Sequence, residues 1–177
     1  MKTSNHKTPT TAEPSLTARS AVVMSSHLSP HPIQLGVKAL DVLYEIGFED
    51  GDDLTDVSLV DIVSVPGGGP KIAKEILNFR ESTLRNDFTL GFTQEEHWKV
   101  LHSILSLCHE RAKNIIVQLK PRTVPEFINF GWEDILSTRS CGRVTFDQIF
   151  SLQSEVRKIL TQNPDISSED LRIEIVS

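Results

Sequence analysis

Apolar residues in the central part of the chain recur at helical spacing, in short stretches separated by polar turns. Between residues 37 and 46 they occupy positions 39, 40, 42, 43 and 46, which form one face of an amphipathic helix. Similar spacing predicts helices over 59–64, 71–82, 125–130, 132–138 and 145–160, and a short helix is expected near 53–57. From 93 to 116 the pattern predicts either one long helix or two shorter ones with a break. An all-α fold is therefore expected.

Residues with known preferences for helix ends agree with these limits. Ser58 is a suitable N-cap for the helix that follows it, and Thr93 forms a capping box with Glu96. Gly47 ends the first helix, and Asn163-Pro164 stops the last one.

The two ends of the chain lack the helical pattern. Residues 1–32 are rich in Ser, Thr, Pro and His without an apolar period, so we expect a disordered tail there. A basic arm that helps to hold DNA is the alternative for this segment. Residues 163–177 are acidic, and Leu171 to Ile175 alternates like a lone edge strand. A mobile acidic tail is the preferred interpretation of residues 163–177.

The central motif is the stretch from Val65 to Lys71, which reads Val-Pro-Gly-Gly-Gly-Pro-Lys between two predicted helices. Three consecutive glycines permit a tight turn with positive φ, and Pro70 suits the first position of the next helix. The motif predicts a helix, a glycine hairpin and a second helix whose first amides face outward. Such amides attract phosphate oxygens. A purely steric role for the glycines is the alternative.

A weaker copy of this motif follows 73 residues later, from Arg139 to Thr145. With that offset Gly69 aligns with Gly142, and the register of apolar and turn positions holds without a gap. We therefore interpret the chain as a duplication, because repetition of this kind reflects repeated structural units. The first module is expected at 33–90 and the second at 91–162, each a small helical bundle with a helix-hairpin-helix element.

Charge is distributed unevenly along the chain, whose formal net charge is -6. Residues 1–35 carry three basic and one acidic side chain, and residues 36–92 carry five basic and eleven acidic ones. Residues 93–160 carry nine basic and eight acidic side chains, and residues 161–177 carry one basic and four acidic ones. An acidic surface is repelled by a polyanion at long range. The second module is therefore the better candidate for contact with nucleic acid.

Cysteine usage and hydropathy bear on where the protein works. Two cysteines, Cys108 and Cys141, argue against a disulfide scaffold and fit a reducing compartment. No stretch approaches the roughly 20 apolar residues of a membrane span, and no signal peptide is recognised. We expect a soluble, cytoplasmic protein without a membrane partner.

The sequence offers no pattern for a metal, cofactor or catalytic site. The acidic run at 49–53 lacks the ligand spacing of a calcium loop, and the His and Cys residues between 97 and 109 form no zinc pattern. Lys71 does not follow the glycine spacing of a P-loop. We expect no cofactor, no metal and no enzymatic activity, and we assign Trp98 and Trp132 to the core.

Both modules resemble a known family, the C-terminal domain of the bacterial RNA polymerase alpha subunit, over about residues 35–85 and 105–160. Gly36 to Leu43 and Arg111 to Asn114 are similar to the opening helix of that family, and the two glycine turns are similar to its hairpin. The resemblance implies a compact bundle of four or five short helices in each module. The long assembly domain of the alpha subunit has no counterpart in this chain.

In that family an Arg and an Asn of the opening helix, the hairpin Gly, and a Lys and a Ser after it approach the DNA minor groove and its phosphates. By position, the second module keeps Arg111, Asn114 and Gly142. Thr145 stands at the position of the hydroxyl, and Arg143 lies beside the position of the Lys. The resemblance therefore implies that these five residues contact DNA.

The first module keeps less of this set. Lys38 replaces the Arg and Asp41 replaces the Asn, whereas Gly69 and Lys71 are retained and Ile72 replaces the hydroxyl. A carboxylate that faces phosphate is unfavourable. Lys38, Gly69 and Lys71 are thus weaker candidates, and we expect the acidic first module to contact a protein instead.

These features predict an accessory DNA-binding protein of transcription that binds AT-rich duplex weakly, by shape, and that meets RNA polymerase or a transcription factor. The alternative is a protein–protein interaction adaptor without DNA contact, which the negative net charge and Asp41 favour. In that case Arg111 and Asn114 belong to a solvated helix face. An enzyme subunit is the remaining hypothesis.

Overall fold

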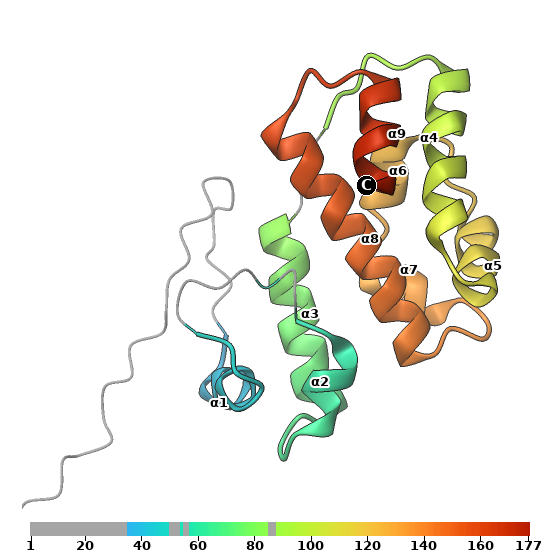
Figure 1. Ribbon diagram of the computed structural model, residues 1–177. Helices are drawn as coiled ribbons and strands as arrows, with labels where there is room; N and C mark the ends of the chain where they lie inside the picture. The colour runs from blue at the N-terminus through green and yellow to red at the C-terminus, as the bar shows by residue number, and fades with distance from the viewer. Residues whose placement is uncertain (1–34, 50–53, 55–56, 85–87) are drawn as a thin grey trace, which may run out of the picture.

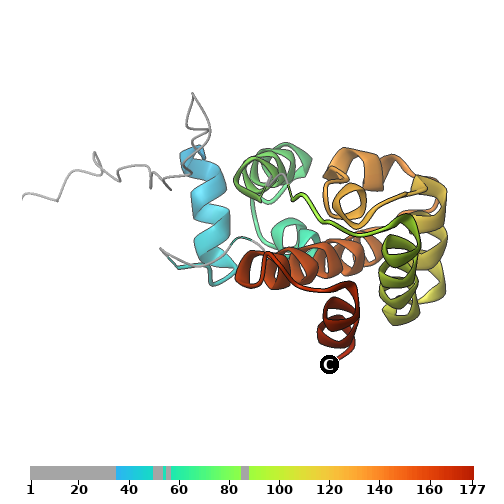
Figure 2. The same ribbon diagram turned by 90° about the horizontal axis from the view of Figure 1, so that it is seen from above.

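The computed structural model describes residues 35–49, 54, 57–84 and 88–177. Within these ranges the regular structure is helical and no strand occurs, which confirms the all-α prediction (Figures 1 and 2). The predicted tail at 1–32 and most of the helix expected at 53–57 lie outside the described residues. The helices of the described chain are α1 (Val37–Glu45), α2 (Leu59–Ser64), α3 (Pro70–Leu84), α4 (Gln94–Leu107), α5 (Glu110–Leu119), α6 (Val124–Ile128), α7 (Trp132–Ser137), α8 (Arg143–Gln162) and α9 (Ser168–Val176).

Local capping explains why several helices begin where the sequence predicts. The Ser58 hydroxyl accepts a hydrogen bond from the Asp61 amide at 3.1 Å at the start of α2. Thr93 and Glu96 form the predicted capping box at the start of α4. The apolar stretch from 93 to 116 contains two helices, α4 and α5, because the chain is extended at Cys108 and at His109, the N-cap of α5.

The structure repeats itself at the offset found in the sequence. Shifting α2 by 73 residues gives the bounds of α7, and the first residue of α3 falls on the first residue of α8. Matching positions are buried alike: Ala39 and Ala112 are both 0% exposed, as are Ile62 and Ile135.

Unusual backbone conformations are repeated as well. Four described residues have positive φ, and they form two pairs at the same offset: Gly47 (89°) with Lys120 (53°), and Gly67 (87°) with Ser140 (71°). The first pair follows α1 and α5, and the second pair occupies the two hairpin turns. Because a side chain makes this conformation unfavourable, its recurrence at matching positions reflects the same chain path in both halves.

The two halves share one hydrophobic core. Buried apolar side chains from both belong to a single continuous cluster. Asp147 of α8 accepts hydrogen bonds from the Leu59 and Val60 amides at the start of α2, at 2.7 and 3.1 Å. The residues at the matching positions of the repeat also meet: Lys74, which matches Asp147, forms an ion pair at 3.0 Å with Glu133 of α7, which matches Val60. The division into modules at 33–90 and 91–162 remains a prediction.

The two hairpins lie at one end of the molecule. In Figure 1 the α2–α3 turn and the start of α8 both lie at the lower edge, with α1 beside the first and α5 beside the second. Figure 2 shows α1 at one end of the row of helices and α4 with α5 at the other. The arrangement places two similar helix-and-turn surfaces on one side of the fold.

The prediction of a mobile acidic tail or lone strand at 163–177 is wrong. Residues Ser168–Val176 form helix α9, which packs against α4. Ser167 caps the helix by accepting the Asp170 amide hydrogen bond at 3.1 Å. Leu171 and Ile175, which lie one helical turn apart, are 0% and 9% exposed. Burial of these two side chains stabilises the helix. A strand at these residues would have no neighbouring strand to pair with and would be less stable.

The assignment of Trp98 to the core is incorrect, whereas Trp132 is partly buried and packs against the core. Trp98 is 58% exposed on α4, because the buried face of that helix is formed by His97, Val100, Leu101 and Ile104. Trp132 is half-buried, and its indole N–H donates a hydrogen bond to Asn78 at 2.9 Å. Trp132 therefore packs against the core while its N–H links α7 to α3.

Because His97 is buried, we expect the folded chain to lose stability in acid. Its Nδ1 accepts a hydrogen bond from the Val124 amide at 3.3 Å, which requires the neutral imidazole. Burial lowers the pKa of His97 below its ordinary value of 6.5, although Glu96 and Glu126 oppose this shift. The unfolded chain therefore binds the proton first, so we expect the free energy of unfolding to fall as pH decreases from about 7 to about 5. Urea titrations at each pH measure this change.

His97→Gln should flatten this pH dependence, because the amide does not titrate. His102→Gln is the matched control, since His102 is exposed on the same helix and should leave the pH dependence unchanged. An equal slope in His97→Gln and the parent chain contradicts the assignment.

Candidate nucleic-acid interface

Each half of the chain forms a groove between its opening helix and its hairpin turn. In the second half, α5 and the turn that follows α7 enclose a groove of about 570 Å³. In the first half, α1 and the α2–α3 turn enclose one of about 700 Å³. The residues that the resemblance predicts to contact DNA line these two grooves, except those at the start of α8.

The groove of the second half brings Arg111 and Asn114 together with the turn. Both side chains are exposed on α5 and line the groove with Arg139 and Ser140. The remaining described residues of the lining are apolar or uncharged, so none of the described carboxylates lines this groove. The His109 Nδ1 accepts a hydrogen bond from the Ala112 amide at 3.3 Å. This N-cap fixes the start of α5, two residues before Arg111. The groove is thus a positively charged surface on a capped helix.

The three predicted residues at the start of α8 are placed differently from one another. Gly142 is the N-cap of α8, and Arg143 is its exposed first residue. Thr145 is only 4% exposed. Thr145 is one of the buried residues of α8, with Phe146 and Ile149, so it is far less accessible than Arg143, and its contact with DNA stays a prediction. The other two residues keep positions from which they can reach a ligand.

Arg139 was not among the residues predicted from the sequence to contact DNA, although it lines the same groove as Arg111. The signal was present, because Arg139 immediately precedes the second turn and is exposed. The family pattern gave it no role, and its match in the first half is Pro66.

The groove of the first half contains all the residues predicted there. Lys38 and Asp41 of α1 face Gly69 and Lys71 of the hairpin across it, and Glu75 also lines it. The Glu75 carboxylate accepts the Gly36 amide hydrogen bond at 2.6 Å. With Glu45, three carboxylates and two ammonium groups line this groove, so it lacks the uniform charge of its counterpart.

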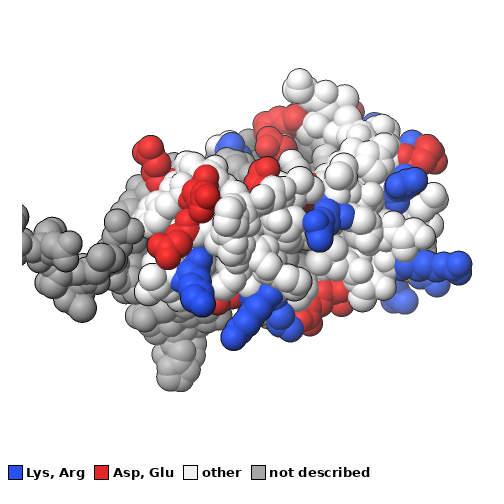
Figure 3. Space-filling model, turned by 90° about the horizontal axis from the view of Figure 1, so that it is seen from below, with Lys and Arg blue, Asp and Glu red and all other residues white. Residues whose placement is uncertain are grey.

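Figure 3 shows the end of the molecule that carries the hairpins. Acidic side chains gather on the left of this view, over the first half, whereas the right side carries more basic ones. The difference follows the uneven charge of the sequence and separates the two grooves electrostatically.

The described part of the chain was also expected to lack a metal site and a membrane span. No group of three or more His, Cys, Asp or Glu side chains within it is placed to hold a metal ion. Burial raises the pKa of the Cys108 thiol to about 11, so this cysteine is unreactive near neutral pH. None of the described helices combines the length and the apolar character needed to cross a bilayer.

Comparisons with family models, with curated proteins and with solved structures gave no match to this chain. The resemblance to the C-terminal domain of the alpha subunit is therefore still a prediction.

Proposed function

We propose that this chain is a non-enzymatic, cytoplasmic DNA-binding accessory protein of transcription. Its second half contacts the DNA minor groove and the flanking phosphates through the groove between α5 and the α7–α8 turn. The proposal is carried by one observation: Arg111, Asn114 and Arg139 line a single groove to which no carboxylate of the described residues contributes.

The physical properties of these groups suit a duplex. A guanidinium is weakly hydrated and is favoured in a narrow minor groove, which A·T-rich sequences provide. Asn114 can both donate and accept at base edges or phosphates. The start of α8, next to the exposed Arg143, adds backbone amides that favour phosphate oxygens. These contacts fix position more than they read sequence, so binding should be weak, shape-sensitive and salt-dependent.

The first half suits a different partner. Its groove contains Asp41, Glu45 and Glu75, which oppose close approach of a phosphate backbone. We assign this groove to contact with a protein, such as RNA polymerase or a transcription factor. An adaptor that uses both grooves for proteins is the second candidate, and the carboxylates of this groove favour it.

Arg111→Ala tests the function directly. We expect it to weaken binding to an AT-rich duplex by at least about tenfold, because a desolvated Arg contact in a DNA groove contributes about 1–3 kcal/mol. Lys38→Ala is the matched control at the equivalent position of the first half, and it should change affinity by less than about twofold. Fluorescence anisotropy from about 50 to about 200 mM salt measures both variants.

The outcomes separate the candidates. Loss of binding in Arg111→Ala alone supports the DNA-binding proposal. Absence of binding by the parent chain at low salt contradicts it and favours the adaptor, whose partner a polymerase pull-down would then test. Equal weakening by the two substitutions contradicts the assignment of DNA contact to the second half.

A further inference from the structure

The groove of the first half, between α1 and the α2–α3 turn, has an apolar floor that is open to solvent. Among the described residues, its apolar lining consists of Val37, Val42, Pro66, Pro70 and Ile72. Val37 is 65% exposed, and both prolines are exposed as well. Apolar side chains gathered in a groove of about 700 Å³ are typical of a surface that a partner covers.

Two carboxylates at this groove are available to such a partner. Asp41 and Glu45 lie one helical turn apart on α1, and both are exposed. Neither forms an ion pair within 4.0 Å in the described part of the chain, although Lys38 and Lys71 line the same groove. The last turn of α1 contains no basic residue, and the C-terminal end of a helix is itself negative. This end of the groove therefore attracts positive charge.

The duplication shows that these carboxylates are peculiar to the first groove. At the offset of 73 residues Asp41 matches Asn114 and Glu45 matches Gln118, and both amides line the second groove. A carboxylate and a carboxamide have nearly the same size, but only the amide can donate a hydrogen bond. A proline also stands where the second groove has Arg139. The two grooves thus share their elements and differ in charge.

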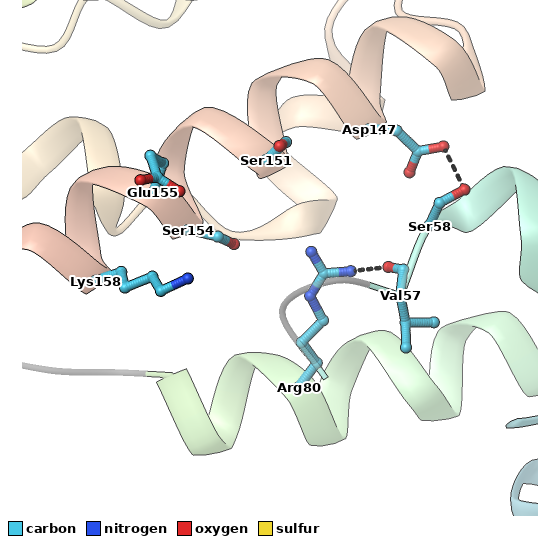
Figure 4. A pocket seen from close by; sticks show the side chains of 8 residues that line it. All are labelled: Val57, Ser58, Arg80, Asp147, Ser151, Ser154, Glu155 and Lys158. Carbon is cyan, nitrogen blue, oxygen red and sulfur yellow. Dashed lines mark hydrogen bonds between the residues drawn. The ribbon is translucent and has the colours of Figure 1, made fainter. Parts of the chain in front are cut away.

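Charged groups in the cleft between the halves are, by contrast, engaged within the chain (Figure 4). There Asp147 accepts a hydrogen bond from the Ser58 hydroxyl at 3.2 Å, and Arg80 donates one to the Val57 carbonyl. The charges of that cleft are therefore directed at groups of the chain itself. The two carboxylates of α1 have no such partners in the described chain, so their charge is directed outward.

We propose that the first groove binds a cationic helix of a protein partner, one that presents two Arg or Lys side chains one turn apart. The inference rests on the proposed assignment of this groove to a protein, and it adds the chemistry that recognises that protein. One cation pairs with Asp41 and the other with Glu45, because residues at i and i+4 share one face of each helix. The aliphatic stems of the two cations pack on the apolar floor of the groove.

The probe is a short helical peptide with two arginines and two leucines on one face, and the full chain is the receptor. In a nuclear magnetic resonance titration, the amide signals of α1 and of the α2–α3 turn should shift in a saturable way. A peptide with glutamates in place of the arginines should not bind, because it meets charge of its own sign. Raising the salt concentration from about 50 to about 200 mM should weaken the binding of the arginine peptide.

The combination of Asp41→Asn with Glu45→Gln should lower the affinity for the arginine peptide about tenfold, because it removes both ion pairs and keeps the size of the side chains. The matched control combines Asp61→Asn with Glu155→Gln. It changes the net charge by the same amount at exposed positions outside the groove, and it should change the affinity by less than about twofold.

Equal losses in the two double variants, equal binding of the two peptides, or no binding of the arginine peptide would overturn the inference. Shifts of the α1 signals that depend on chain concentration alone would assign the groove to a second copy, and shifts caused by duplex DNA would assign it to nucleic acid. Either result also contradicts the inference. Arg111→Ala should keep the parent affinity for the peptide. Failure of the parent chain to bind duplex therefore contradicts the proposed DNA contact and leaves the peptide result standing.

Discussion

Gly68→Ala is expected to destabilise the chain by more than about 3 kcal/mol, because it places a methyl group where the backbone already lies. A Cβ at this position would stand 1.6 Å from the Ile62 carbonyl oxygen and 3.2 Å from the Val65 oxygen. Neither atom belongs to a flexible side chain, so the turn between α2 and α3 would have to open. Urea denaturation followed by far-UV circular dichroism measures the loss.

The neighbouring glycines are matched controls for this effect. A Cβ at Gly69 meets nothing within 4 Å, so Gly69→Ala should change the free energy of unfolding by no more than about 1 kcal/mol. Gly67 has a φ of +87° but no close contact, so Gly67→Ala should cost about 1–2 kcal/mol through backbone strain alone. If all three substitutions cost the same, the close approach of the chain at Gly68 is refuted.

These three glycines show what a single sequence can and cannot reveal about the hairpin. Their composition correctly indicates a tight turn before α3, and positive φ does occur at Gly67. The reason for each glycine depends on where the Ile62 carbonyl lies, which is a three-dimensional fact. Sequence reasoning could therefore predict the turn but not which glycine is indispensable.

The helices were predictable where local signals agree with burial, as in α2 with its Ser58 cap. In α9 the signals conflict, because Ile173 is 57% exposed between the buried Leu171 and Ile175. Alternation then resembles a strand, although Leu171 and Ile175 also match helical spacing and Ser167 is a usable N-cap. The partner helix α4, which determines which side is buried, is distant in the sequence.

The grooves were predictable as pairs of segments but not in detail. The repeat placed Arg111 near the second turn, and the structure brings Arg111 and Arg139 to one groove. It could not show that Thr145 is buried, because the packed face of α8 depends on the other half of the chain.

Asp147→Ala should separate α2 from α8 and lower the free energy of unfolding by about 2 kcal/mol. The carboxylate accepts three hydrogen bonds from Ser58, Leu59 and Val60 at the start of α2, which lie 87 to 89 positions earlier in the sequence. A side chain of one half of the chain thus caps a helix of the other. Removal leaves the Leu59 and Val60 amides without these acceptors and weakens the join between the halves. Urea denaturation measures the change, and hydrogen exchange at these two amides should accelerate.

Asp134→Ala is the control that distinguishes this join from ordinary capping. Asp134 accepts the Gly131 amide hydrogen bond at 3.2 Å at the start of α7, within its own half. Its loss should cost only about 0.5–1 kcal/mol, typical of a local cap. An Asp147→Ala effect no larger than that of Asp134→Ala would mean that the core alone joins the halves. A larger effect, together with faster exchange at Leu59 and Val60 but not at the amides of α7, shows that the duplicated halves depend on this carboxylate.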